Sequence, residues 1–486
     1  PAVTAVDINP QINFAVPAGT ERERSEGLAL PADIVRGTDG TLYVAAKGSA
    51  RVGVLDSNGN VQARIAVGNG PTGLAIDAEG KKLYVLNSFD GTVSIVDLGT
   101  GAEVNRVSAG FNPEPAQIQR GRLFLYDASL SAHGDVACAS CHRNGHRDGL
   151  AWDLGDPKGT LETTPADDFF PLLGPIKKTD GVFHPMKGPM TTQSLRGIIG
   201  TEPLHWRGDM ATFQDFNPAF MTLLGGPRQL TDPEMADFTA FVQSLTYPPN
   251  PFENPDRTYP DPPTGPSAAR GFDLFTNSRL DLGVLSCNAC HQASPGFGSG
   301  TDRSLIAGTA ILQSQSLKVP QLRGEFEKVG MARTAGEQLS GFGFEHDGNV
   351  DSLLDFLRTP LFTFVSDDQR NDVVAFLMAF DTGTAPSVGM QVTVRADNKT
   401  SQAVADRINL LMSQAEAGNC DLIVKGVYGS AKRGFLYKGA GTFQSDRKAE
   451  SEFPWQTLVQ SASVGGEITF TAVPRGFGYR IGIDKA

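Results

Sequence analysis

The sequence lacks several features that would point to a membrane or nucleic-acid partner. None of its apolar runs approaches the roughly 20 residues that a transmembrane helix needs. Acidic residues outnumber basic ones by 54 to 42, and a net charge of -12 would repel nucleic acids and anionic membranes. The sequence begins at Pro1, without a Met and without the basic and then apolar residues of a signal peptide. We therefore expect a mature, processed or incomplete chain. The acidic surface would attract basic partners.

Cysteine is also scarce, and four of the five cysteines fall into two short motifs. These motifs are CASCH at Cys138–His142 and CNACH at Cys287–His291. Two thiols separated by two residues, with a His directly after the second, suit covalent attachment of haem and ligation of its iron. A four-thiolate zinc site or redox dithiols are the alternatives, but a His follows both pairs. The predicted haem-binding residues are Cys138, Cys141, His142, Cys287, Cys290 and His291.

These motifs predict a two-haem c-type cytochrome with His142 and His291 as the proximal iron ligands. Because c-type haem is attached outside the cytoplasm, we expect a periplasmic, cell-surface or secreted protein. The fifth cysteine, Cys420, opens the apolar run Leu422–Val424, so we expect a buried thiol. Pairing with another chain or a missing segment is the alternative in an oxidising compartment.

A repeat precedes the first motif. The tripeptide LYV occurs at Leu42–Val44 and again at Leu83–Val85, 41 residues later. In each copy a Gly-containing turn precedes the tripeptide, and a second apolar segment, Val52–Leu55 or Val93–Val96, follows it. A period near 40 with about four short strands per unit is typical of β-propeller blades, and these units resemble the YVTN-type repeat. Two blades do not close a ring, so we expect a propeller-completing segment or another subunit to cover them.

The segment Gly121–His142, GRLFLYDASLSAHGDVACASCH, resembles the bacterial di-haem cytochrome c peroxidase and MauG family. In that family each of two cytochrome-c-like domains carries one haem. After each C-x-x-C-H motif the sequence also contains two further short motifs that occur in both halves of the chain's haem region. TTQSLRG at Thr191–Gly197 is followed by HWRGD at His205–Asp209, and KVPQLRG at Lys318–Gly324 is followed by HDG at His346–Gly348. This duplication supports two related domains.

The resemblance covers residues 113–381 and implies two mainly α-helical cytochrome-c-like haem domains. The helices Asp232–Leu245 and Ser366–Phe380 would close them, and the Pro-rich stretch Tyr247–Pro266 predicts an extended linker. After Thr382 the pattern predicts a separate β-rich module. The expected organisation is β-propeller-like blades (residues 1–112), a first haem domain (113–250), a linker (251–266), a second haem domain (267–384) and a C-terminal β-rich α+β domain (385–486).

In the C-terminal module one segment has the apolar spacing of an amphipathic helix, and several segments alternate apolar and polar residues as strands do. The helix is predicted at Ser401–Ala417. Strands are predicted near Leu422–Val427, Gly434–Tyr437, Glu467–Ala472 and Tyr479–Ile483. No residues with recognisable chemistry accompany them, so we expect a structural or docking role.

The distal ligands decide between electron transfer and catalysis, because an open sixth position admits peroxide or oxygen. In the peroxidases a distal His occurs just before a K-G-P stretch, and His184 of HPMKGP resembles it with a one-residue change in spacing. Met186 and Met190 are rivals. For the second haem the family places a Met where this chain has Pro360. Met331 is the nearest thioether.

His346 is the alternative ligand for the second iron. Members of the family commonly bind a calcium ion between the domains, so calcium is possible here, although no carboxylate-rich loop in this sequence indicates a site. The peroxidases also supply a Gln and a Glu for acid–base chemistry after their Trp-x-Gly phrase. Phe216 stands at the Gln position, and Glu234 fits a first-turn charge of the following helix.

The predicted function is therefore electron transfer by a di-haem c-type cytochrome with redox protein partners. A hydrogen-peroxide reductase or MauG-type oxidoreductase is the first alternative, because the resemblance to that family covers both motifs. A surface-binding or assembly protein, in which the blades and the C-terminal module act, is the second.

Overall fold

The computed structural model describes residues 20–110, 112, 114–155, 159–167, 178–293, 305–306, 315, 317–330 and 343–483. The chain divides into two compact units. The first comprises Pro1–Trp152 and Thr191–Leu245, and the second comprises Asp153–Met190 and Thr246–Ala486. No helix within the described ranges has the length and apolar character to cross a bilayer.

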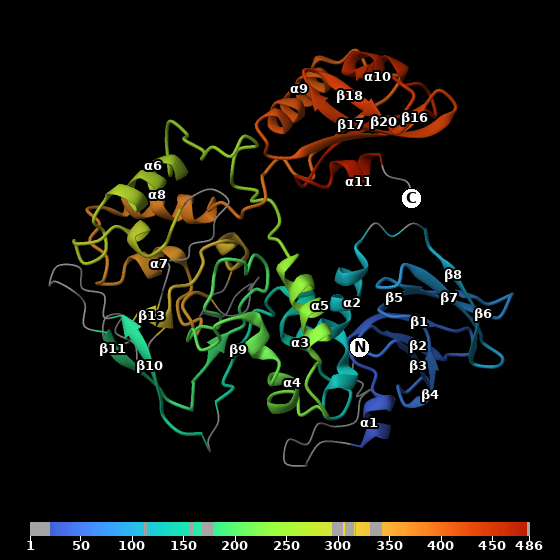
Figure 1. Cartoon of the computed structure of the whole chain (residues 1–486), viewed down its shortest axis with the longest axis horizontal. Helices are drawn as coiled ribbons and strands as arrows, with labels where there is room; N and C mark the ends of the chain where they lie inside the picture. Colours follow the sequence, from blue (N-terminus) through green and yellow to red (C-terminus); the bar gives the residue numbers. More distant parts are fainter. Residues whose placement is uncertain are drawn as a thin grey trace. The chain divides into compact units, whose positions relative to one another are not determined.

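The first unit opens with helix α1 (Glu21–Glu26) and two four-stranded antiparallel sheets, drawn in blue in Figure 1. Each 41-residue repeat forms one sheet, and neighbouring strands in the sheet are also neighbours in sequence. The first blade comprises β1 (Pro31–Arg36), β2 (Leu42–Ala46), β3 (Arg51–Leu55) and β4 (Val61–Ala66). The second blade comprises β5 (Pro71–Asp77), β6 (Lys82–Asn87), β7 (Thr92–Asp97) and β8 (Ala102–Ser108).

One face of the second blade packs against the first. Along β6, Leu83 and Val85 are buried whereas Tyr84 and Leu86 are exposed, because successive side chains of a strand point to opposite faces. The buried side chains join a core with residues of the first blade such as Val52. The shared core is Tyr43, Val52, Ile65, Val67, Leu83, Val85 and Val96.

The prediction of two mainly α-helical haem domains is wrong. The helices around the motifs are short, and the chain as a whole is rich in antiparallel strands. In the first unit they are α2 (Ala116–Tyr126), η1 (Ala128–Leu130), α3 (Cys138–Cys141), η2 (Arg143–Gly145), η3 (Phe213–Phe216), α4 (Ala219–Thr222) and α5 (Asp232–Gln243). In the second unit they are α6 (Ala268–Asn277), η4 (Cys287–Ala289), η6 (Glu325–Glu327), α7 (Leu353–Leu357) and α8 (Asp367–Met378).

Short strands occupy part of the chain between these helices. β9 (Ala151–Trp152) and β12 (Met190–Thr191) flank a segment of the second unit. A further four-stranded sheet consists of β11 (Lys178–Phe183), β10 (Glu162–Asp167), β13 (Leu305–Ile306) and β14 (Leu317–Lys318), in that order. The sequence between the closing helices is dense in Gly and Pro, which shorten helices, and this explains why the helical content is lower than the family resemblance implied.

Each unit contains one close helix pair. In the first unit α2 crosses α5 at Gly121, where a side chain would strike the backbone carbonyl of Asp237. In the second unit α6 crosses α8 at Gly271, where a side chain would strike the carbonyl of Asp372. Only Gly allows backbones to approach so closely. The residue before each Gly is an Arg that pairs with the same Asp.

These ion pairs have similar geometry. Arg120 Nε lies 2.7 Å from Asp237 Oδ2, and Arg270 Nη2 lies 2.9 Å from Asp372 Oδ1. The starts of the closing helices also match. Thr231 caps α5, one residue before the predicted Asp232, and the Ser366 hydroxyl caps α8. The duplication that the repeated phrases indicated is therefore present in the backbone and in its stabilising contacts.

The Pro-rich stretch Tyr247–Pro266 packs along the second unit. The Asn250 side chain donates hydrogen bonds to the carbonyls of Met378 and Phe380, each at 2.9 Å. Arg257 pairs with Asp381 at 2.7 Å. These contacts hold the stretch against the end of α8.

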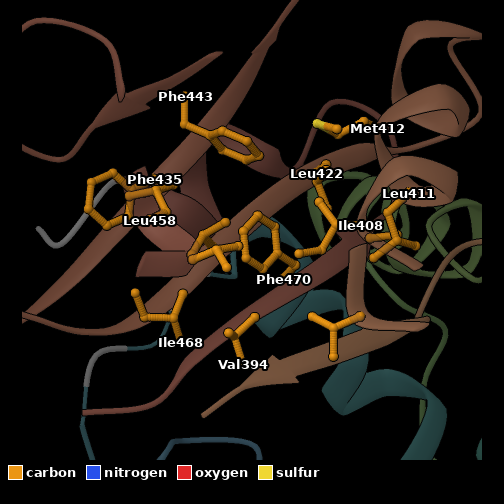
Figure 2. Close-up of a cluster of buried hydrophobic side chains, with 14 of the residues drawn as sticks. Val394, Ile408, Leu411, Met412, Leu422, Phe435, Phe443, Leu458, Ile468 and Phe470 are labelled. Carbon is orange, nitrogen blue, oxygen red and sulfur yellow. The ribbon is translucent and has the colours of Figure 1, made fainter. Parts of the chain in front are cut away.

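The C-terminal module is a six-stranded sheet with helices α9 (Gln402–Glu416) and α10 (Trp455–Ser461) packed on it. Its strand order is β15 (Gln391–Val394), β20 (Ile468–Val473), β16 (Asp421–Tyr428), β17 (Ala431–Gly439), β18 (Thr442–Ser445) and β19 (Phe453–Pro454). Ile408 and Leu411, one turn apart on α9, face Phe470 of the sheet in Figure 2. Burial of these apolar side chains stabilises the module.

One predicted strand of this module is a helix instead. Residues Tyr479–Ile483 lie at helix α11 (Gly478–Gly482). The Asp421 carboxylate accepts hydrogen bonds from the N–H groups of Gly476 and Gly478, each at 2.8 Å, and so fixes the start of this helical turn. The alternation of apolar and polar residues was therefore misleading over five residues.

The buried carboxyl group of Glu253 predicts how the free energy of unfolding changes with pH. The side chain is 7% exposed, and neither carboxylate oxygen has a hydrogen-bond partner in the described part of the chain. Burial, with the nearby Asp381 charge, raises its pKa to about 8 from 4.5, while Arg257 opposes the shift. Because the folded state holds this proton more tightly than the unfolded state, the free energy of unfolding should fall as pH rises from about 4.5 to about 8.

We expect Glu253→Gln to flatten this dependence and to raise the free energy of unfolding at pH 7 by roughly 1–3 kcal/mol, since Gln cannot ionise. Urea denaturation at pH 5 and pH 8, followed by tryptophan fluorescence, measures the difference. Glu467→Gln, at an exposed position of the same unit, is the control. A pH dependence unchanged by Glu253→Gln would contradict the assignment.

Candidate haem-binding sites

Both C-x-x-C-H motifs form a single helical turn. In the first, α3 spans Cys138–Cys141, and the His142 N–H donates to the Cys138 carbonyl at 2.9 Å. In the second, η4 begins at Cys287, and the His291 N–H donates to the Cys287 carbonyl at 2.8 Å. Residues three apart on a helical turn lie on the same face. The turn therefore places both thiols of a motif on one side, with the His next to them.

None of the five cysteines forms a disulfide. Burial raises the pKa of Cys138 and of Cys287 to about 12. The thiols are therefore protonated at neutral pH, unlike the low-pKa thiols of redox dithiols.

The repeated L-R-G phrase contacts the proximal histidines. Pro320, two residues before Leu322, has its carbonyl 3.2 Å from Nδ1 of His291. A carbonyl only accepts hydrogen bonds, so Nδ1 carries the proton and Nε2 keeps its lone pair for a metal. The equivalent residue in the first phrase is Gln193, whose backbone acts on the pKa of His142.

The two histidines are also kept neutral. Burial lowers the pKa of His142 to about 4, although the backbone of Gln193 has the opposite effect. Burial likewise lowers the pKa of His291 to about 4, and the Pro320 carbonyl opposes it. Metal ligation requires neutral imidazole. Two thiols and a neutral imidazole at each motif therefore fit a covalently attached haem, and a hydrogen bond orients the imidazole at the second motif.

The structure does not test either of the two predicted distal ligands, His184 and Met331. His184 is exposed and belongs to the second unit, whereas His142 belongs to the first. The Met186 N–H donates to Nδ1 of His184 at 3.1 Å. Ligation of the first iron by His184 stays a prediction. Met331 lies outside the described residues, and its role stays a prediction as well.

The alternative ligand His346 lies in a polar cluster. Its ring and the carboxylates of Glu345 and Asp347 have potential ligand atoms within 4.8 Å of one another. The three residues are consecutive and partly exposed. Neither a calcium ion nor ligation by His346 follows from this arrangement, and calcium stays a prediction.

Glu234 has a structural role. Its carboxylate accepts the Thr231 N–H at 2.8 Å in a capping box and pairs with Arg228 at 2.6 Å. The hydrogen bond from Arg228 is the main reason that the pKa of Glu234 falls to about 2. A carboxyl group that stays ionised to this pH cannot donate a proton near neutrality. Cys420 is buried, as predicted.

A functional pair that the sequence analysis missed lies in the HWRGD phrase. Nδ1 of His205 lies 2.7 Å from a carboxylate oxygen of Asp209. The Phe216 ring meets the His205 ring edge-on, with centroids 4.6 Å apart. The four-residue spacing of His and Asp was visible in the sequence, but nothing there showed that a turn brings them into contact.

Comparison with known proteins gives a local similarity. No protein-family model matches the chain. The chain is similar to hydrazine synthase subunit gamma of Kuenenia stuttgartiensis. They are 25% identical over 180 residues, which are 37% of this chain and 43% of the subunit, so the chain matches less than half of that relative's length.

Two solved structures of Kuenenia stuttgartiensis hydrazine synthase also match. One shares 28% identity over 16% of this chain and 23% of its own, with a TM-score of 0.16. The other, pressurised with xenon, shares 16% identity over 56% of this chain and 89% of its own, with a TM-score of 0.36. Neither TM-score is high enough to assign a fold.

The resemblance to di-haem cytochrome c peroxidases and MauG is therefore wrong. The curated relative that the sequence matches is a hydrazine synthase subunit, and the fold around the motifs is not the pair of mainly helical domains that the resemblance implied. The peroxidase description fails with it. Haem binding stays a prediction that rests on the two motifs and their geometry.

The fifth cysteine makes haem attachment testable with a matched control. Replacing Cys138 and Cys141 together by Ser should remove one haem, and so should replacing Cys287 and Cys290, because each pair would hold one group. Cys420→Ser should remove none, since that thiol is buried in the C-terminal core. Intact-protein mass spectrometry and the pyridine haemochrome spectrum count the haems. Wild-type protein without covalent haem, or with zinc in its place, would refute the assignment.

Proposed function

We propose that this chain binds two covalently attached c-type haems and transfers electrons outside the cytoplasm. The observation that carries the proposal is the duplicated turn. At each motif two thiols share one face, and a neutral His follows them. At the second motif the Pro320 carbonyl also leaves Nε2 of His291 with its lone pair for a metal. A periplasmic, cell-surface or secreted location belongs to the same proposal, because c-type haem is attached there.

The groups of the chain have separate tasks in this function. The bound haem iron supplies a one-electron redox couple. The cysteines fix each haem by thioether bonds, and the neutral histidines ligate the irons without losing a proton. Partial burial of His142 and His291 lowers the pKa of both side chains, so each imidazole would be neutral when it ligates an iron.

Redox protein partners with a basic surface fit the acidic chain. A net charge of -12 attracts a positively charged partner over several ångströms and raises the rate of encounter. The proposal therefore includes a basic electron donor or acceptor, which salt would screen.

A role within a larger assembly is the second candidate function. The relative's name describes it as a subunit of hydrazine synthase. The second blade also has an outer face with Tyr84, Leu86 and Val107, which are 37%, 42% and 43% exposed. In the strand register Leu86 pairs with Val93, and Val93 pairs with Val107, so these side chains lie in one row.

The first blade differs from the second, because Leu28 covers its sheet at Gly53. The Leu28 side chain is fully buried there. Terminal units of repeat proteins need a polar outer face unless another element covers them. We propose that a blade-type β-sheet of a partner subunit covers the second blade.

The electron-transfer function predicts a dependence on partner charge. A basic c-type cytochrome should exchange electrons with the haem-loaded chain, and the rate should fall several-fold between about 0.01 and 0.15 M salt, as the Debye length shortens from about 30 to about 8 Å. Stopped-flow absorbance measures this rate. An acidic carrier of similar potential is the control, and its rate should rise with salt. Absence of exchange with both carriers would count against an electron-transfer role.

A further inference from the structure

Two tight hairpins occupy equivalent places in the duplicated region. In the first, the Leu204 N–H donates to the Met210 carbonyl at 2.6 Å, and in the second the Phe344 N–H donates to the Val350 carbonyl at 2.7 Å. The residue after each donor has a left-handed backbone. His205 has φ of 71° and Glu345 has φ of 67°. Non-glycine residues rarely adopt this conformation, so both positions are held by the surrounding structure.

The side chains at these two positions differ in chemistry. Each contacts the residue four positions later. In the second hairpin the Asn349 amide donates to the Glu345 carboxylate at 3.2 Å. In the first hairpin Nδ1 of His205 lies 2.7 Å from the Asp209 carboxylate. Only the first pair contains a group that can ligate iron through nitrogen.

The His205–Asp209 pair fixes a ligand-ready tautomer. A carboxylate accepts hydrogen bonds, so Nδ1 of His205 donates and Nε2 retains its lone pair. Metal-ligating histidines usually donate their other ring N–H to a carboxylate or carbonyl in this way, which orients the ring and raises its basicity. The edge of Phe216, at an interplanar angle of 86°, also fixes the ring plane.

His205 lies in the same unit as His142 and close enough to influence it. The two imidazole rings are near enough to interact electrostatically. The hairpin also borders the hydrophobic core around the first motif, which contains Leu204 and the stem of Cys138. A second imidazole thus lies near the first one.

We propose that His205 is the second axial ligand of the first haem and that Asp209 is its positioning residue. This inference rests on the proposed haem binding. The first haem is then six-coordinate with two histidines and suits electron transfer, because both axial positions are filled. His184 differs, since Nδ1 of that residue accepts a backbone N–H and the lone pair is engaged there.

The test is His205→Gly in the haem-loaded chain. Gly accepts the left-handed backbone without strain, so the variant should fold while losing the imidazole. We expect the first haem to change from low-spin to high-spin in electron-paramagnetic resonance and optical spectra, while the second haem is unchanged. Added imidazole should restore the low-spin signal. Glu345→Gly, at the equivalent position of the second hairpin, should leave the first haem unchanged.

Several outcomes would overturn the inference. These are a low-spin first haem in His205→Gly, a high-spin first haem in the wild type, and a high-spin signal in the variant that imidazole does not restore. Conversion by His184→Ala in place of His205→Gly would assign the ligand to His184. Haem counting by mass spectrometry separates these results from failure of haem binding itself, because the haem content of His205→Gly should remain two.

Asp209→Ala tests the positioning role separately. It should keep the low-spin signal but lower by about tenfold the cyanide concentration that replaces the ligand, since loss of such a hydrogen bond weakens metal affinity by about 10- to 100-fold. Asp209→Asn, which retains an acceptor oxygen, should recover most of the wild-type value. Equal cyanide titrations for Asp209→Ala and wild type would exclude the positioning role.

Discussion

The close helix crossing in each unit is the contact on which the motif geometry depends. Gly121 lets α2 approach α5, and Gly271 lets α6 approach α8, to distances that any side chain would prevent. The first helix of each pair also contacts the turn that carries the cysteines. A larger residue at either Gly would separate the helices and move the attached motif. The haem-binding residues are thus placed by a backbone constraint some distance away in sequence.

Local features of this arrangement could be predicted from the sequence. The 41-residue repeat predicted paired strands, and α5 and α8 begin within a residue of their expected starts because capping residues mark them. The overall content of helix could not be predicted, since a family resemblance was extended over Gly- and Pro-rich stretches that do not support long helices. The error at Tyr479–Ile483 has a similar cause, because a distant carboxylate, Asp421, decides the local conformation.

The candidate site shows the same division between local and distant information. The C-x-x-C-H spacing indicated the thiols and the proximal histidines directly. Their tautomer depends on a carbonyl far along the chain, Pro320 for His291, which spacing does not reveal. The His205–Asp209 contact needs a hairpin with a left-handed residue, a conformation that non-glycine residues adopt too seldom for the sequence to indicate it. Contacts that depend on unusual backbone conformations therefore cannot be predicted from the sequence.

The duplicated region has kept its proximal side and varied its opposite side, and the chemistry of the contacts explains why. At Pro320 the partner of the proximal histidine is a backbone carbonyl, so the side chain at that position is free to change, and Gln193 stands at the equivalent position. In the hairpins the contact is between side chains, so a change of residue changes the chemistry. Under the proposed ligation, His–Asp in one hairpin and Glu–Asn in the other would give the two haems different surroundings. Two haems held by motifs of the same C-x-x-C-H pattern would then differ in coordination and in reduction potential.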